Sequence, residues 1–357
     1  MSEPSTDIGS RKIGWLCSFV PEELILAAGL EPIRIQGRVD AIEQAGGYLF
    51  PKICPYVKNL LDSGLRLKLD GVAGMIFANS CDGMRRLLDL WRQYVSTPFS
   101  YMLEVPKNLT EDAMTYFADR LLDLMNSLKG AFGVEISESK LKQAIYVMNE
   151  HRSLVARIFE AQKEDPPRYK GSELLSILSA EGTRPKGEMT PLLSDLAMGR
   201  GATGSGSKRG IRLLVLGNRI DRPALFDMVE KAGGSIVVFD TCNGLRHYTK
   251  LVENSMAPLE ALARRYLLKP SCPRMPGFEA RLERVKLLVR EFRVQGIIYS
   301  ALKFCDYGLF ETPQVEKLSK ELGLPALVLE DDYVWADIGR SRTRVEAFLE
   351  MVRSKLG

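Results

Sequence analysis

The sequence predicts an α/β protein in which two parallel-sheet halves are joined by a helical segment. Near both ends of the chain, short apolar runs alternate with amphipathic stretches of helical length, which is typical of a parallel sheet covered by helices. The stretch between them carries only helical patterns, and a glycine- and serine-rich run at 199–210 predicts a linker. We therefore expect a first α/β domain at 1–107, a helical segment with its linker at 108–209, and a second α/β domain at 210–357.

Strands in the first domain are predicted from apolar runs bounded by turn residues, at 13–16, 32–35, 71–78 and 98–103. The run at 71–78 predicts a buried strand. Helices are predicted at 21–29, 54–65 and 82–94. The first of these helices has Pro21 in its first turn and Gly29 at its end, the positions that proline and glycine favour in helices.

Similar patterns predict the helices and strands of the rest of the chain. Three helices are predicted in the middle segment, at 108–127, 137–161 and 172–179. Strands of the second domain are predicted at 211–216, 235–239, 296–300 and 326–329, and helices at 223–232, 258–267, 277–292, 313–322 and 342–356. Because strands and helices alternate again, the second sheet is also expected to be parallel.

Composition and charge exclude several classes of protein. The chain has 357 residues, of which 45% are hydrophobic and 26% charged, with a formal net charge of +4. No basic run of the nucleic-acid-binding kind stands out, and R-S-R-T-R at 340–344 is interpreted as a solvated helix face. No run of about 18 apolar residues predicts a membrane span. The polar start of the sequence lacks a secretory signal, so we expect a cytoplasmic protein with reduced thiols.

The cysteines are the residues that indicate chemistry. There are six of them, Cys17, Cys54, Cys81, Cys242, Cys272 and Cys305. All are predicted at strand ends, in loops or at helix starts, and the loops that follow parallel strands line the ligand crevice of such folds. A helix N-terminus also favours the thiolate form, which is the form that binds metal.

Three interpretations of these cysteines stay open from chemistry alone. Structural zinc sites favour C-x2–4-C pairs, which the sequence lacks, so zinc is disfavoured. Ligands gathered from distant loops suit an iron–sulfur cluster. A thiol enzyme and ordinary core cysteines are the alternatives, although the apolar runs at 211–216, 236–239 and 326–329 contain no cysteine.

The two α/β domains resemble weak internal repeats. A-N-S-C-D-G-M-R at 78–85 and F-D-T-C-N-G-L-R at 239–246 share a cysteine, an Asp or Asn, a glycine, an apolar residue and an arginine after a predicted strand. Arg85, Arg86 and Arg246 therefore lie beside cysteines, where an arginine could pair with a carboxylate or a phosphate.

Few other side chains are candidates for a site. His151 is expected to be structural, whereas His247 is a candidate to reach the cysteines. Glu22 and Glu23 lie at a predicted helix start, where acidic side chains interact favourably with the helix dipole, and they are interpreted in that way.

The run G-A-T-G-S-G-S-K at 201–208 resembles a phosphate loop. Its spacing is wrong, however, and it precedes a strand where a phosphate loop follows one, so no ATP site is expected. No catalytic residue is assigned.

Long motifs carry a resemblance to a known family. They are G-W-L-C-S-F-V-P-E-E-L-I-L-A-A-G-L-E-P-I-R-I at 14–35, C-P-Y-V-K at 54–58, N-S-C-D-G-M-R-R at 79–86, F-D-T-C-N-G-L-R-H-Y at 239–248, K-F-C-D at 303–306 and R-T-R-V-E-A-F-L-E-M at 342–351. On these motifs the chain resembles the D-component subunits of 2-hydroxyacyl-CoA dehydratases and the subunits of benzoyl-CoA reductases. The similarity covers both α/β domains, and the middle helices are less distinctive.

The resemblance implies two Rossmann-like domains with a [4Fe–4S] cluster between them. By motif, the three ligands of that cluster match Cys54, Cys81 and Cys305. The resemblance further implies an electron from a separate ATP-hydrolysing activator protein with its own cluster. The substrate would be an acyl-CoA, either dehydrated by a lyase or reduced by an oxidoreductase. The subunit is expected to form a homodimer or to pair with a paralogous subunit.

Another branch of the family resembles this chain through its additional cysteines. Members of that branch hold a double-cubane [8Fe–9S] cluster with cysteines of both domains and reduce small molecules. Cys17, Cys242 and Cys272 would complete such a ligand set. Two hypotheses of other classes stay open, a non-catalytic cluster-bearing electron-transfer or scaffold subunit and a metal-free α/β binding protein.

Overall fold

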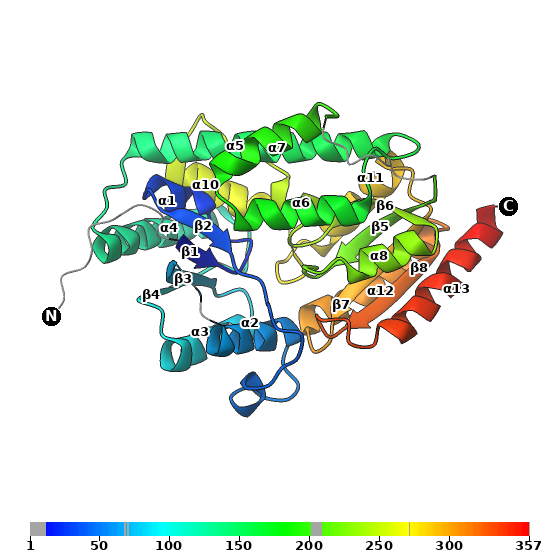
Figure 1. Cartoon of the computed structure of the whole chain (residues 1–357). Coiled ribbons are helices and arrows are strands. Elements are labelled where there is room, and N and C mark those ends of the chain that lie inside the picture. Colours follow the sequence, from blue (N-terminus) through cyan, green and yellow to red (C-terminus); the bar gives the residue numbers. More distant parts are fainter. Residues whose placement is uncertain (1–11, 68, 70, 201–208, 271, 357) are drawn as a thin grey trace.

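The computed structural model describes residues 12–67, 69, 71–200, 209–270 and 272–356 (Figure 1). Within these residues the chain forms two four-stranded sheets, and every strand pair in both sheets is parallel. The predicted α/β class with two Rossmann-like parallel sheets is therefore confirmed.

The first sheet has the strand order β2-β1-β3-β4. Its strands are β1 (Lys12–Trp15), β2 (Glu31–Arg34), β3 (Val72–Ala78) and β4 (Phe99–Leu103). Neighbouring residues of β3 point to opposite faces, so Phe77 packs with α2 (Pro55–Arg66) and α3 (Asp82–Leu90), whereas Ile76 packs with α1 (Glu22–Ala27). Both faces of this sheet are therefore covered by helices.

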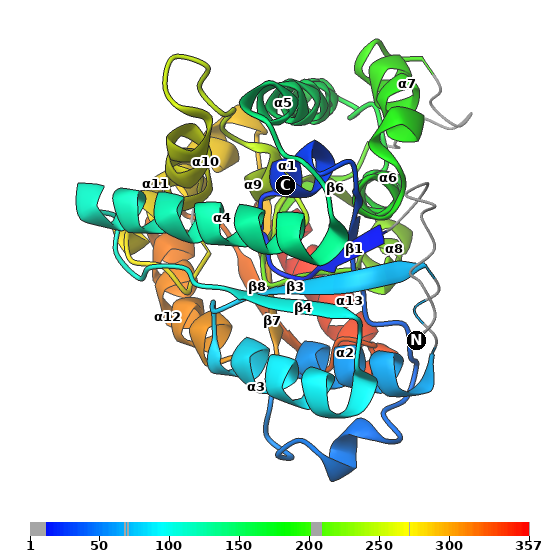
Figure 2. The same ribbon diagram turned by 90° about the vertical axis from the view of Figure 1, so that its left-hand side faces the viewer.

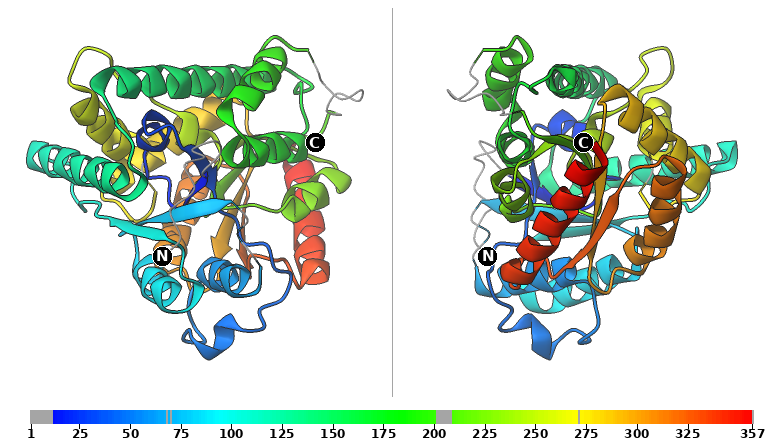
Figure 3. Two further views of the ribbon diagram at one scale, coloured as in Figure 1. Left: turned by 60° about the vertical axis from the view of Figure 1, so that its left-hand side comes forward. Right: turned by 90° about the vertical axis from the view of Figure 1, so that its right-hand side faces the viewer.

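The second sheet repeats that order as β6-β5-β7-β8. Its strands are β5 (Ile211–Gly217), β6 (Gly234–Asp240), β7 (Gly296–Leu302) and β8 (Ala326–Asp331). Its helices are α8 (Ala224–Lys231), α9 (Leu245–Tyr248), α11 (Phe278–Glu291), α12 (Asp306–Glu321) and α13 (Ile338–Leu356). The helix α13 packs beside α8, and α12 lies across the sheet from it (Figure 3).

The middle helices are α4 (Glu111–Phe132), α5 (Glu138–Glu160), α6 (Gly171–Thr183) and α7 (Lys186–Ala197). Ser and Thr caps explain where the long ones begin, because Thr110 Oγ1 accepts a hydrogen bond from the backbone N–H of Ala113 and Ser137 Oγ from that of Lys140. Figure 1 shows α5 running over both sheets, and Figure 2 shows it from its end. The middle segment thus bridges the two halves.

One helix from late in the sequence returns to the first sheet. Helix α10 (Pro258–Leu268) packs on α4, and its buried Leu262 and Tyr266 belong to the same apolar core as Ile76 (Figure 2). The boundaries expected at 107/108 and 209/210 stay predictions. The position of α10 means that the core of the first half contains residues from beyond the second of these boundaries.

Several element boundaries differ from the sequence predictions. The helix expected at 313–322 begins already at Asp306, so Pro313 lies inside it. Proline cannot donate to the carbonyl of Leu309, and the hydroxyl of Thr312 donates to that oxygen instead at 2.8 Å. The short α9 and the separate α7, which contains Pro191, were not predicted.

Most of the linker predicted at 199–210, including the phosphate-loop-like run at 201–208, lies outside the described residues. Among the helices that the structure describes, none is long and apolar enough to cross a membrane.

Candidate functional site

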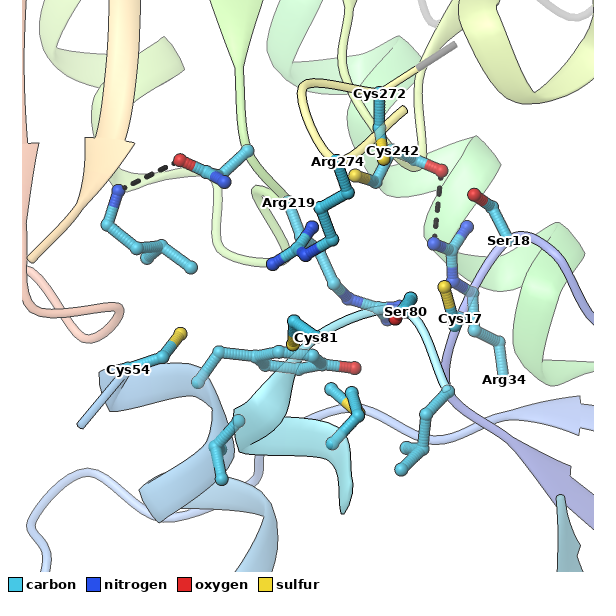
Figure 4. A pocket seen from close by; sticks show the side chains of 16 residues that line it. Cys17, Ser18, Arg34, Cys54, Ser80, Cys81, Arg219, Cys242, Cys272 and Arg274 are labelled. Atoms are coloured by element: carbon cyan, nitrogen blue, oxygen red, sulfur yellow. Dashed lines mark hydrogen bonds between the residues drawn. The ribbon is translucent and has the colours of Figure 1, made fainter. Parts of the chain in front are cut away.

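The carboxyl ends of strands from both sheets meet at one cavity. Residues just after β1, β3, β5 and β6 line it, and Leu302 at the end of β7 does so too. The full lining is Leu16, Cys17, Ser18, Arg34, Cys54, Tyr56, Val57, Ser80, Cys81, Met84, Asn218, Arg219, Cys242, Cys272, Arg274 and Leu302 (Figure 4). The cavity lies where ligands bind in open parallel sheets, and it is formed by both halves together.

Three cysteines occupy the residue that precedes a helix. Cys54 precedes α2, Cys81 precedes α3 and Cys305 precedes α12. Cys54 and Cys81 line the cavity, while the buried Cys305 contacts two of its lining residues, Asn218 Nδ2 at 3.4 Å and Arg274 Nη2 at 3.7 Å from its sulfur. The positive end of each helix dipole therefore lies at a thiol, which favours a bound thiolate.

The other three cysteines lie in loops without such a helix start. Cys17 follows β1 by two residues, Cys242 follows β6 by two residues, and Cys272 comes from the loop after α10. All three line the same cavity (Figure 4). The structure thus brings together all six cysteines named from the sequence, although they come from both ends of the chain.

Five of the six thiols fall into two groups by the charges that act on them. Burial and then the charge of Cys305 raise the pKa of Cys54 to about 12, with a smaller contribution from Cys81. Burial and then the charge of Cys272 likewise raise the pKa of Cys17. Because charges act on one another at short range, these shifts place Cys54 near Cys305 and Cys81, and Cys17 near Cys272.

The arrangement does not suit one metal ion. Among the described residues, no group of three or more His, Cys, Asp or Glu side chains could hold a single ion. Sulfurs around one zinc ion would each lie about 2.3 Å from it.

Cations hold the backbone of the cysteine loops. Arg34 Nη2 donates to the carbonyl oxygen of Cys242 at 3.0 Å, and Lys107 Nζ donates to that of Ser80 at 2.8 Å. Lys269 Nζ donates to the carbonyl oxygen of Ser18. Each bond fixes a carbonyl at a cysteine or next to one. Burial and then the charge of Arg265 lower the pKa of Lys269 well below its usual value, so the contribution of Lys269 is its hydrogen bond.

Two more arginines enter the cavity itself. Arg274 Nη2 lies 3.7 Å from the sulfur of Cys305. Burial works to lower the pKa of Arg274, but the charges of Cys81, Cys305, Cys272 and Cys242 raise it well above its usual value. Arg219 comes from the end of β5 and lies over the ring of Tyr56, 5.2 Å from its centre. Figure 4 shows both arginines between the cysteines. These cations offset the negative charge that thiolates bring into a buried site.

The arginines named from the sequence do not line the cavity of the cysteines. Arg85 and Arg86 are exposed on α3, where Arg85 donates to Asn79 and Arg86 pairs with Asp82 and Asp89. Arg246 is buried and donates to the carbonyl of Gly217, beside a different cavity. Sequence reasoning missed Arg34, Arg219 and Arg274 because it considered arginines only within the repeated cysteine motif. The sequence did contain a signal for them: Arg34 and Arg219 lie at the ends of predicted strands, and Arg274 lies two residues after a cysteine.

The two histidines have structural surroundings. His151 is buried between Glu181 and Thr190, as expected. His247 does not line the cavity; it stacks on Trp15, and burial, then the charges of Arg34, Lys269 and Arg265, hold its pKa well below the usual value. His247 is therefore held neutral behind the cavity wall.

The acids expected as dipole partners are instead buried ion-pair partners. Glu23 accepts from Arg152 Nη2 at 2.5 Å and from Tyr266 Oη at 2.8 Å. Glu22 lies 2.9 Å from Lys186 Nζ. Both side chains connect α1 to helices that are distant in sequence, a contact that no local pattern predicts.

Comparison of the sequence with known proteins relates the chain to one family. The profile of the family described as 2-hydroxyglutaryl-CoA dehydratase, D-component, matches residues 17–352. The chain is 24% identical to the (R)-phenyllactyl-CoA dehydratase beta subunit of Clostridium sporogenes, over 96% of this chain and 92% of that protein. It is 26% identical to a benzoyl-CoA reductase subunit of Thauera aromatica, over 88% and 84% of the two chains. It is also 26% identical to the beta subunit of (R)-2-hydroxyglutaryl-CoA dehydratase of Acidaminococcus fermentans, over 96% and 92%.

The family profile covers the cysteine-bearing parts of both halves, from Cys17 at its first residue to beyond Cys305. A match of this length includes the middle helices and every strand that the structure describes except β1. The chain therefore belongs to the 2-hydroxyglutaryl-CoA dehydratase D-component family, whose similar members include dehydratase beta subunits and a benzoyl-CoA reductase subunit.

Proposed function

We propose that this chain is an iron–sulfur enzyme subunit that is activated by reduction and passes a low-potential electron to a substrate in the cavity between its halves. The observation that carries the proposal is the gathering of thiols from both ends of the chain around one cavity. A buried position between two domains suits such an electron, because it must be kept from water and oxygen.

All six cysteines are proposed as ligands. Cys54, Cys81 and Cys305 form one group, which the family motif assigns to a [4Fe–4S] cluster. Cys17, Cys242 and Cys272 form a second group on the same cavity. Two sets of three thiols favour the double-cubane [8Fe–9S] cluster over a single [4Fe–4S] cluster.

The residues present fit such a cofactor. When bound, it would supply low-potential electrons and an iron that accepts a substrate oxygen. The protein's own part is to hold the thiols on backbone fixed by Arg34, Lys107 and Lys269 and to offset the thiolate charge with Arg274. Cations near the site also make an added electron less costly.

The electron is proposed to come from a separate ATP-hydrolysing activator protein with its own cluster. The substrate is proposed to be an acyl-CoA thioester or a small molecule, because similar proteins are named for phenyllactyl-CoA, benzoyl-CoA and 2-hydroxyglutaryl-CoA. Those proteins are also named as subunits, which supports a partner subunit, either a second copy or a paralogue.

The names of these similar proteins also allow a second candidate function, because they are named as subunits. One subunit of an enzyme complex can bear a cluster without catalysing a reaction. The chain would then be an electron-transfer or scaffold component. Turnover by the purified chain with its activator and ATP, measured with acyl-CoA and small-molecule substrates, separates the two. Turnover supports the enzyme, whereas a cluster that is reduced without turnover supports the scaffold.

Serine variants of one cysteine from each group test the ligand assignment. We expect Cys81→Ser and Cys272→Ser each to lower the iron content of anaerobically purified protein, because serine is a poor ligand for iron–sulfur clusters. Met84→Leu, which changes a lining residue without a thiol, is the control and is expected to keep its iron. Full iron in Cys272→Ser would remove the second group from the proposal.

A further inference from the structure

Arg219 is placed in the cavity by the shape of the backbone that precedes it. Gly217, at the end of β5, has a φ of +123°, and a Cβ atom there would lie 2.0 Å from the carbonyl oxygen of Ser300 on the neighbouring strand. Only glycine allows this close approach. Two residues later, Arg219 lines the cavity with 5% of its surface exposed (Figure 4).

A chain of hydrogen bonds fixes one edge of the Arg219 guanidinium. Its Nε donates to Asp221 Oδ2 at 2.5 Å, and the hydroxyl of Tyr333 donates to the same oxygen at 2.6 Å. That hydroxyl accepts a bond from the backbone N–H of Gly37, in the first half, at 2.9 Å. Tyr333 has a left-handed backbone with φ of 73°, which is costly for a bulky residue and is found where a side chain must be held in place.

The other edge of the same guanidinium is buried without a partner. Among the described residues, neither Nη1 nor Nη2 of Arg219 has a hydrogen-bond partner, and the same is true of Asp221 Oδ1. A buried, charged donor left unpaired costs free energy, so such donors normally face an acceptor. Two parallel N–H groups of one arginine match the two oxygens of a carboxylate-like anion.

The charge around Arg219 also favours an anion. Arg34, on the same cavity, carries a second buried guanidinium, and its Nε has no partner within the described residues. Arg219 and Arg34 are both buried and line the same cavity, so their like charges repel one another. Asp221 pairs with the Nε edge of Arg219 alone, and an anion facing the other edge would give the two remaining nitrogens of this guanidinium a partner.

We propose that Arg219 binds a small oxyanion of the carboxylate type in this cavity, as the anionic group of the substrate. The inference rests on the proposed function, because it takes the cavity to be where the substrate is reduced. Arg219 would act as the residue that selects and orients an anionic substrate, with Asp221 and Tyr333 as positioning residues.

Equilibrium dialysis of anaerobically purified, cluster-loaded protein against radiolabelled formate tests this binding, with unlabelled formamide as a neutral competitor of the same shape. We expect about one formate per chain and no competition by formamide. Arg219→Met should weaken formate binding by about tenfold or more, because two charged hydrogen bonds are lost, and Arg219→Lys should weaken it less. Arg290→Met, which removes an exposed arginine on α11, is the matched control and should bind like wild type.

Iron content, measured on the same samples, separates the two proposals. The inference is supported if Arg219→Met loses formate binding and keeps the iron of wild type. Formate binding unchanged in Arg219→Met, or no binding by cluster-loaded wild type, overturns it. Loss of iron in both Arg219 variants also overturns it and assigns the arginine to the cluster. A wild type that is purified without iron would contradict the proposed function alone, because dialysis of that iron-free protein still decides whether formate binding depends on Arg219.

Discussion

The thiols of this protein lie where a free thiolate is unfavourable. Burial and the nearby Cys305 raise the pKa of Cys54 to about 12, and burial also raises the pKa of Cys17. Near neutral pH both are therefore protonated without metal, and a bound metal would have to displace their protons. The cations at the cavity, above all Arg274, work in the opposite direction and prepare the site for negative charge.

Asp331 is a buried carboxyl whose effect on stability has the reverse of the usual sign. Burial raises its pKa from 3.8 to about 7, although Ser300 Oγ and the backbone N–H of Tyr333 donate to it. The folded state thus holds a proton that the unfolded state has lost above about pH 4. The stability that this proton contributes is complete below about pH 4 and is lost as the pH rises through about 7.

We therefore expect Asp331→Asn to flatten the pH dependence of stability. Between about pH 4 and 7 the difference between wild type and variant should change by about 1.4 kcal/mol per pH unit. Free energies of urea unfolding at pH 5, 6, 7 and 8 measure it, with Asp119→Asn, exposed on α4, as the control. Parallel curves for wild type and Asp331→Asn would show that Asp331 does not titrate in this range.

At the scale of elements, the strands could be predicted from the sequence. The repeat of the two α/β domains could be predicted only in part, because the cysteine motif that they share does not align their strands. Each predicted strand is present within a few residues, because buried parallel strands are short apolar runs bounded by turns. The repeated motif around Cys81 and Cys242 is misleading, however, since it follows the third strand of one sheet and the second strand of the other. By topology the counterpart of Cys81 is Cys305, which also lies three residues past a third strand and precedes a helix.

The beginning of α12 shows why boundaries were harder to predict. Pro313 looks like a helix start, and only the bond from Thr312 to the Leu309 carbonyl lets the helix begin seven residues earlier, directly after Cys305. That compensation depends on side-chain geometry within a formed helix. It is therefore not visible as a sequence pattern.

The end of β5 provides a test at this scale. Gly217→Ala places a methyl group against the Ser300 carbonyl oxygen at a positive φ, so we expect a loss of several kcal/mol in unfolding free energy. Gly130→Ala in α4, where a Cβ atom meets nothing within 4 Å, should be neutral or stabilise by up to about 1 kcal/mol. Denaturant unfolding compares them, and equal effects of the two substitutions would argue against a tight β5–β7 contact.

For the whole molecule, buried ion pairs connect segments that no sequence pattern joins. Glu23 of α1, Arg152 of α5 and Tyr266 of α10 meet in one hydrogen-bonded group, so that the first sheet, the middle segment and a late helix are fixed together. The sequence indicated that cysteines of both halves meet, because loops at strand ends face a common crevice. It did not indicate these long-range pairs, since the acids look like ordinary helix-start residues.

Removing the cation of this group should loosen the assembly. We expect Arg152→Met to cost about 3–5 kcal/mol of unfolding free energy, because it leaves the buried Glu23 without its compensating charge. The double variant Arg152→Met/Glu23→Gln should regain part of that loss, since no buried charge then remains unpaired. Urea unfolding measures both, and a single variant as stable as wild type would mean that the pair contributes nothing to holding α1 against α5.

The central claim, that six thiols from both halves hold one iron–sulfur site, is tested most directly by counting iron and acid-labile sulfide per chain after strictly anaerobic purification. The account predicts about eight irons, the content of a double-cubane cluster held by both groups of cysteines. About four irons would contradict the part assigned to Cys17, Cys242 and Cys272 and leave Cys54, Cys81 and Cys305 as the ligands. A well-folded protein without iron would contradict the claim as a whole.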